Sequence, residues 1–128
     1  MLGVTRNVQV FACPYPTDMR KSYTGLFGLV REVLGRGPLS GHLFLFVARN
    51  RRSAKVLLYD GTGLCIFSKR LQQGLFVAPW ERADAGDIRM TQSELALFLE
   101  GSAAVHRQLS PNVFLPREIS TSPVSFAL

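Results

Sequence analysis

Three apolar runs separated by two turns constrain the fold of this chain most strongly. The runs span residues 42–48, 54–60 and 63–71 and are rich in Val, Ile, Leu, Phe and Tyr, which favour a pleated, half-buried backbone. The second turn, Asp60-Gly61-Thr62-Gly63, contains residues that tolerate positive φ in a tight hairpin. The stretch therefore predicts a three-stranded antiparallel meander.

The first turn of this meander is strongly basic. Arg49, Arg51 and Arg52 occupy its tip, and Lys55 follows just inside the next strand. Two interpretations are open at this point. The tip is either a solvated charged turn that favours solubility, or a surface that faces an anionic partner.

The residues before the meander predict one strand and one helix. Residues 6–13 alternate in the manner of a first strand, and two prolines follow them and prevent its continuation. Apolar residues then recur at helical spacing as far as Gly35. This pattern predicts a long amphipathic helix with Thr17 or Asp18 as its N-cap.

The residues after the meander predict two further elements. Residues 75–78 are expected to form a short fourth strand and residues 81–90 a polar loop. Thr91-Gln92-Ser93-Glu94 is a capping-box pattern, which predicts a short, mostly buried second helix ending at Glu100-Gly101.

The expected fold class is α+β. We expect an antiparallel sheet of four to five strands, with one long helix packed across it and a short C-terminal helix, in the order β-α-β-β-β-β-α. Residues 1–101 are expected to form this single domain. Residues 102–128 are rich in Ser and Pro and are expected to form a divergent, poorly ordered tail.

Length and composition fit one globular domain. A chain of 128 residues is long enough to bury a core without a metal or disulfide. No apolar run approaches the roughly 20 residues of a membrane-spanning helix, and the N-terminus lacks a secretion signal. We therefore expect a cytoplasmic protein without a membrane partner. Cys13 and Cys65 belong to no metal or redox motif and are expected to be free thiols.

Positive charge is concentrated in the half of the chain that contains the meander. Residues 1–72 carry eleven Lys or Arg against three Asp or Glu, a net charge of +8, whereas residues 73–128 have a net charge of −2. This asymmetry favours a nucleic acid or another polyanion as partner.

Two further cations lie at the predicted start of the first helix. Arg20 and Lys21 would sit at the positive end of the helix dipole, where cations are disfavoured. Exposed helix amides beside two cations are suited to phosphate. A solvated helix start, in which an Asp18 cap offsets the mismatch, explains the same residues equally well.

Candidate catalytic residues are better explained by structural roles. Asp60 fits a turn and Asp18 a helix cap, while the other acids lie in a polar loop or on helices. His42 and His106 accompany no motif of nucleophilic catalysis, and the glycine pairs are typical of turns. The sequence therefore predicts a protein that is not an enzyme, with no cofactor and no metal site.

Several segments together resemble a known family. TDMRKSYTGL, PLSGHLFLF, KVLLYDGTGLCIFSKRL, GLFVAP and a helix ending in FLEG are similar, in order and spacing, to the small accessory protein, called Orf2 or TnpB, of bacterial insertion sequences of the sixty-six family. The likeness covers Val8 to Gly101. The family usually has Trp where this chain has Tyr59 and an acid where it has Gln72.

The resemblance implies a protein encoded beside a larger transposase and needed for transposition. Combined with the charge asymmetry, it predicts a non-catalytic accessory protein that binds DNA phosphates and acts with the transposase. The alternative is a module that docks on the transposase without contacting DNA, with Tyr59, Phe67, Phe76 and Trp80 as possible aromatic anchors. The oligomeric state is left open. The predicted DNA-binding residues are Arg20, Lys21, Arg49, Arg51, Arg52, Lys55, Lys69 and Arg70.

Overall fold

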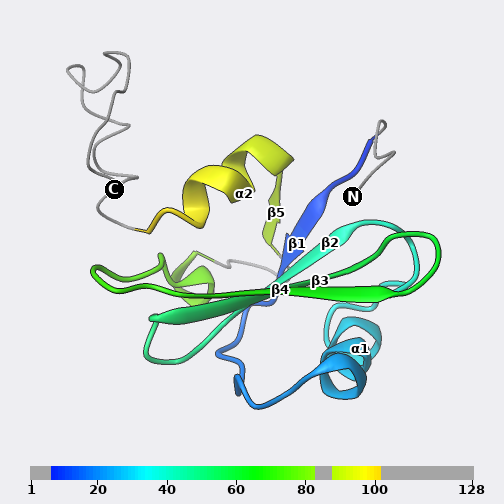
Figure 1. Ribbon diagram of the computed structural model, residues 1–128, viewed down its shortest axis with the longest axis horizontal. Coiled ribbons are helices and arrows are strands. Elements are labelled where there is room, and N and C mark those ends of the chain that lie inside the picture. The colour runs from blue at the N-terminus through cyan, green and yellow to red at the C-terminus, as the bar shows by residue number, and fades with distance from the viewer. Residues whose placement is uncertain (1–6, 83–87, 102–128) are drawn as a thin grey trace.

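The computed structural model of the protein describes residues 7–82 and 88–101. Within them it contains five strands, two α-helices and one 3-10 turn (Figure 1). In chain order these elements are β1 (Val10–Ala12), α1 (Tyr23–Glu32), β2 (Leu43–Val47), β3 (Ser53–Tyr59), β4 (Leu64–Arg70), η1 (Pro79–Glu81), β5 (Ile88–Met90) and α2 (Gln92–Phe98).

The strands form one mixed sheet in the order β4-β3-β2-β1-β5. β1 runs parallel to β2, with Phe11 beside Phe44, while the other three neighbouring pairs are antiparallel. Figure 1 shows α1 on one face of the sheet and α2 on the other. The described helices include none that is both long and apolar enough to cross a membrane.

The sheet confirms part of the expected fold. The α+β class, a strand number within the expected four to five and the antiparallel meander of β2, β3 and β4 are as predicted. The expectation of a wholly antiparallel sheet is wrong, because β1 and β2 are parallel. A chain that leaves a strand at one end of the sheet and crosses back through a helix to the opposite end before the next strand produces a parallel neighbour.

The first helix is shorter than predicted. It begins at Tyr23 after Ser22, so neither Thr17 nor Asp18 is its N-cap. The segment before it has other hydrogen bonds: the Thr17 amide donates to the Val47 carbonyl at 2.9 Å, and Asp18 accepts from the Arg20 amide at 2.9 Å. Extended pairing and a local turn thus replace what the apolar spacing suggested was helix.

The expected fourth strand is also wrong. Residues 75–78 form no strand, and the Phe76 amide instead donates to the Arg51 carbonyl across the end of the β2–β3 hairpin at 2.8 Å. The last strand is β5, which lies within the expected polar loop and pairs with β1 at the opposite edge of the sheet. Residues 83–87 of that loop and the predicted tail 102–128 lie outside the described residues.

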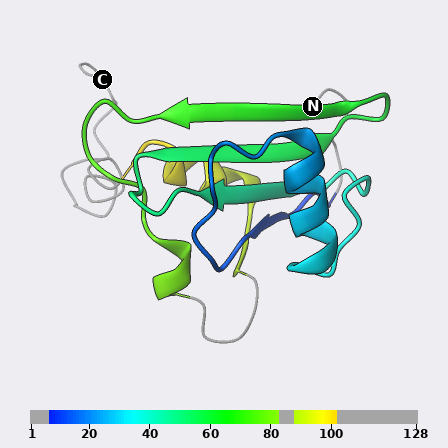
Figure 2. The same cartoon turned by 90° about the horizontal axis from the view of Figure 1, so that it is seen from below.

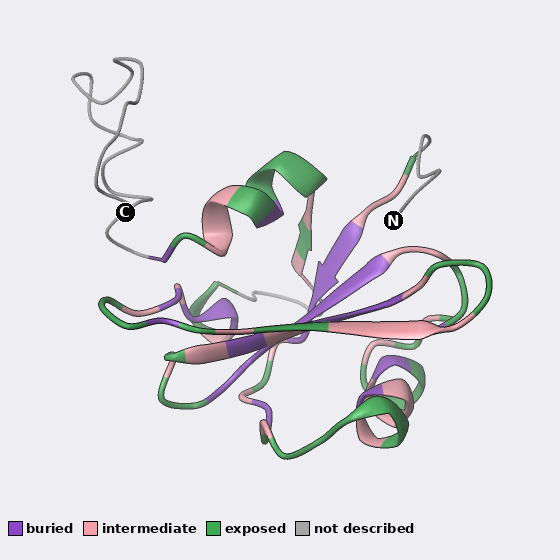
Figure 3. Ribbon diagram, in the orientation of Figure 1, coloured by how far each residue is buried: buried purple, intermediate pink, exposed green. Residues whose placement is uncertain are grey.

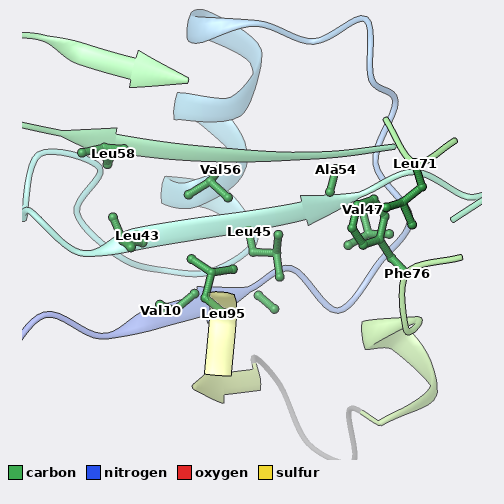
Figure 4. Packing of buried hydrophobic residues seen from close by; sticks show 11 residues of the cluster. Val10, Leu43, Leu45, Val47, Ala54, Val56, Leu58, Leu71, Phe76 and Leu95 are labelled. Carbon is green, nitrogen blue, oxygen red and sulfur yellow. The ribbon is translucent and has the colours of Figure 1, made fainter. Parts of the chain in front are cut away.

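Two apolar clusters sit on the two faces of the sheet. The cluster beneath α1 contains Leu26 and Val30 of the helix against Phe44 and Leu57. The cluster beneath α2 contains Leu95 and the residues labelled in Figure 4. Every residue of β2 is buried, whereas β4 is half-buried or exposed (Figure 3). β2 is therefore the central strand of the domain, and β4 is an edge strand that is partly exposed to solvent.

The capping box that begins α2 gives a test of the fold. The Thr91 hydroxyl oxygen accepts from the Glu94 amide at 3.1 Å, and Glu94 Oε1 accepts from the Thr91 amide at 2.8 Å. We predict that Thr91→Ala lowers the free energy of unfolding by about 1 kcal/mol. Thr91→Ser keeps the acceptor and should unfold like the wild type in urea. Equal losses in the two variants would contradict this role.

The β3–β4 turn gives a test by pH. Asp60 Oδ1 accepts hydrogen bonds from the amides of Thr62 and Gly63 at 2.9 and 3.0 Å. These bonds, with one from the Thr62 hydroxyl, lower the pKa of Asp60 to about 2. A carboxylate whose pKa is depressed by folding stabilises the fold above its unfolded pKa of about 3.9, and this contribution disappears as the pH falls toward 2.

We therefore predict an NMR titration midpoint near pH 2 for the Asp60 carboxyl in the folded protein. Asp60→Asn keeps an acceptor oxygen but cannot titrate, so its unfolding free energy should fall less steeply with acid below about pH 4. A midpoint near the ordinary value for Asp in the folded wild type would disprove the assignment.

Candidate nucleic-acid interface

One end of the sheet gathers segments that are far apart in sequence. The β2–β3 turn, the last residues of β4 and the loop from β1 to α1 all reach this end. The loop reaches it because β1 and β2 are parallel, and the Thr17-to-Val47 hydrogen bond extends their pairing. In Figure 2 the loop passes across the sheet between the turn and α1.

Two cations of the sheet share the face covered by α1. Ser53 is paired with Arg70 and Lys55 with Ser68. Since alternate residues of a strand point to the same face, the side chains of Lys55 and Arg70 lie on one face. The Lys55 ammonium donates to the Lys21 carbonyl at 2.8 Å. This bond fixes the loop beside the strand and brings Lys21 to the same surface.

Two arginines of the turn lie at the same end of the sheet. Arg49 and Arg52 are both exposed. The Leu71 amide donates to the Arg52 carbonyl at 2.8 Å, so Arg52 lies beside the end of β4. We call the end of the sheet that carries Lys21, Arg49, Arg52, Lys55 and Arg70 the basic end.

Arg51 differs from its neighbours in the same turn. Its backbone has φ of 63°, and its Nε donates to the Phe76 carbonyl at 2.8 Å. The Phe76 amide returns a bond to the Arg51 carbonyl at 2.8 Å. Because the Phe76 side chain is fully buried, these bonds attach the hairpin to the core. The Arg51 Nε donor is used in this contact.

Lys69 and Arg70 are adjacent but do not share a surface. Lys69 points to the α2 face, where its ammonium donates to the Leu99 carbonyl at 2.8 Å. A cation at the carbonyl end of a helix is favoured by the helix dipole. Lys69 therefore connects β4 with the end of α2, and the structure does not place it with the basic end.

Arg20 lies near the basic end but is paired. Its guanidinium forms an ion pair with Asp18 at 2.8 Å. The hydrogen bonds that the Arg20 guanidinium and amide donate to the Asp18 carboxylate lower the pKa of Asp18 to about 2. Arg20 and Lys21 precede the first turn of α1, which begins at Tyr23. The prediction that Arg20 and Lys21 lie in the first turn of the helix is therefore wrong.

Two exposed tyrosines border the same loop. Tyr15 has 61% of its surface exposed and Tyr23 has 48%, and exposed aromatic rings beside cations can stack on unpaired bases. Neither tyrosine is among the residues that the sequence predicts to bind DNA. The signal for Tyr15 is its position between Pro14 and Pro16, which restrict the backbone on either side of it.

The other groups with possible chemistry have structural contacts. His42 Nδ1 accepts from the Gln9 amide at 3.1 Å, and its ring packs edge-on against Phe11. Cys13 is a buried free thiol whose pKa is raised by burial, and Cys65 is half-buried and free. Among residues 7–82 and 88–101, no group of three His, Cys, Asp or Glu side chains is arranged to hold a metal ion.

The different roles of Arg51 and Arg52 give a stability test. We predict that Arg51→Ala lowers the free energy of unfolding by about 2 kcal/mol, because a partly buried hydrogen bond is lost. Arg51→Gly should cost about 1 kcal/mol less than Arg51→Ala, since glycine adopts positive φ without strain. Arg52→Ala should change the stability by less than about 0.5 kcal/mol. Urea denaturation measures all three, and equal costs for the two alanine variants would contradict the distinction.

Comparison with known proteins supports the likeness seen in the sequence. The family model described as IS66 Orf2 like protein matches residues 8–108, which extends seven residues past the Gly101 limit of the likeness given by the motifs. The chain is 40% identical over 108 residues to "Uncharacterized protein y4hO" of Sinorhizobium fredii (strain NBRC 101917 / NGR234), covering 84% of this chain and 92% of that protein.

A second protein of the same organism, "Uncharacterized protein y4jC", is 29% identical over 101 residues. That similarity covers 79% of this chain and 85% of the relative. No solved structure matches the chain at a significant level.

Proposed function

This chain belongs to the family of IS66 Orf2-like proteins, and from that premise we propose that it binds DNA phosphates through its basic end and acts with the transposase of its element. The family membership makes it an insertion-sequence accessory protein. The proposal concerns what such a protein contacts. In it, the chain contributes no catalytic group and holds or positions DNA on which the transposase acts.

The observation that carries this proposal is the convergence of cations from three segments. Lys21 comes from the loop before α1, Arg49 and Arg52 from the hairpin turn, and Arg70 from the end of β4. All four are exposed, and the acid of the loop, Asp18, is paired with Arg20. Such a surface favours a polyanion and provides several separate contacts to phosphate oxygens.

The expected mode of binding is tolerant of sequence. α1 packs its apolar side against the sheet through Leu26 and Val30, so its buried side is not available to read a groove. Long cationic side chains on a turn and a strand end are suited to the backbone of DNA. Binding of this kind is sensitive to salt and largely independent of base sequence.

The alternative function, docking on the transposase without DNA, keeps one candidate anchor. Phe76 is buried, Trp80 is half-buried against the core, and the Tyr59 hydroxyl donates to the Gly61 carbonyl. Phe67 alone among the four aromatic residues considered has about half of its surface exposed, at 49%. A docking role through Phe67 would survive neutralisation of the basic end, which separates the two functions.

The proposed DNA contact can be measured by fluorescence anisotropy with labelled duplexes from element ends and of random sequence. We predict that wild type binds both, and that Arg49→Gln combined with Arg52→Gln weakens binding to both. If each arginine contacts one phosphate, the slope of log affinity against log salt should decrease in magnitude by about 2 in the double variant.

A matched control removes the same charge elsewhere. Arg31, in the last turn of α1, and Arg89, in β5 at the far edge of the sheet, are also exposed. Arg31→Gln combined with Arg89→Gln should retain the wild-type salt slope. Equal weakening by the two double variants would reduce the effect to net charge alone. Absence of binding by folded wild type at low salt would reject the direct DNA role.

A further inference from the structure

β4 is a long strand at the edge of the sheet. It spans seven residues, Leu64–Arg70, and pairs with β3 along its whole length. In the described part of the chain β3 is its only neighbour in the sheet. Figure 2 shows β4 as the outermost strand, with α1 set back over the strands behind it, so no described strand or helix covers the outer side of β4.

The hydrogen-bond pattern identifies which backbone groups face outward. The Leu71 amide donates to Arg52, and the Asp60 amide donates to Gly63; both pairs belong to the β3–β4 register. Hydrogen-bonded and non-bonded pairs alternate along an antiparallel ladder. The amide and carbonyl groups that point away from β3 are therefore those of Leu64, Ile66, Ser68 and Arg70.

This edge lacks the usual protection against pairing. Natural edge strands often place Lys, Pro or a bulge where another strand would add. Here Lys69 is turned to the α2 face and held at the Leu99 carbonyl, and Arg70 is the last residue of the strand. Residues 64–68 of β4 include no charged side chain. Phe67, at the centre of the strand, has 49% of its surface exposed.

We propose that β4 pairs with β4 of a second copy of this chain, antiparallel, about a two-fold axis at Phe67. In this register Ile66 is opposite Ser68 of the second copy, and Leu64 is opposite Arg70. These residues are the ones whose backbone groups point outward, so the pairing forms about eight hydrogen bonds. The two five-stranded sheets then become one continuous sheet.

The side chains favour a second copy in this register. Phe67 faces Phe67, an aromatic cross-strand pair, while Lys69 faces Cys65, so no two like charges are directly opposite. An axis at Ser68 leaves Leu64 and Cys65 beyond the paired strand, and an axis at Lys69 or Arg70 brings that cation opposite its own copy. Shifting it toward the N-terminal end leaves Arg70 beyond the paired strand. The central register alone combines full pairing with separated charges.

Cross-linking tests the register directly. Cysteines directly opposite at a non-hydrogen-bonded position have Cα atoms about 4.5 Å apart, within disulfide range, whereas a two-residue offset separates them by more than about 7 Å. In a Cys65→Ser background, Phe67→Cys should give a covalent dimer under mild oxidation at least about tenfold faster than Ser68→Cys. Equal rates, or no covalent dimer, would overturn the proposed register.

Sedimentation velocity tests the association itself. Wild type should sediment as a dimer at tens of micromolar, and Phe67→Lys should weaken the dimer by more than about tenfold because two ammonium groups would meet at the axis. Phe67→Tyr, a conservative control, should remain dimeric. Thermal unfolding confirms that each variant is folded. A monomeric wild type, or a Phe67→Lys variant that remains a dimer, would overturn the proposal whatever the DNA titrations show.

Discussion

The parallel pairing of β1 with β2 is the constraint on which the rest of the structure depends. It places β2 in the interior of the sheet, where both of its faces are buried by separate clusters. It also directs the chain after β1 to the end of β2, where Thr17 bonds to Val47. Without that direction Lys21 would not reach Lys55, and the cations of the loop and hairpin would belong to different surfaces. The same interaction therefore organises the core and assembles the basic end.

Local patterns in the sequence predicted the local structure well. The alternation at Val8, Val10 and Ala12 matches their packing on one face, and the Thr91–Glu94 capping box begins α2 as expected. The errors involve contacts distant in sequence. β5 has only three residues and is defined by its pairing with β1, which no local period reveals. The start of α1 was misjudged for a distant and a local reason. The Thr17 amide donates to the Val47 carbonyl, and Asp18 accepts from the Arg20 amide, so these bonds outweigh an apolar spacing that continues upstream.

At the candidate site, the sequence did not predict which cations make structural contacts and which are exposed. Counting charges showed only that the cations are concentrated in the first half of the chain, whereas residues of one type make different contacts in the fold. Strand alternation could have separated Lys69 from Arg70, because adjacent residues point to opposite faces. Nothing local distinguishes Arg51 from Arg52. Their difference arises from a positive φ and from Phe76, 25 residues away, so only the folded chain assigns one to stability and the other to the surface.

The two proposed surfaces are geometrically compatible, because they use different parts of β4. The basic end uses the side chain at the end of the strand, while self-pairing uses outward backbone groups and Phe67. In the antiparallel pair the Arg70 residues of the two copies lie on opposite sides of the axis, about 20 Å apart along the strand direction. A dimer of this form presents two basic ends related by two-fold symmetry. It is suited to contact two DNA segments arranged about the same axis, whereas a monomer could hold only one.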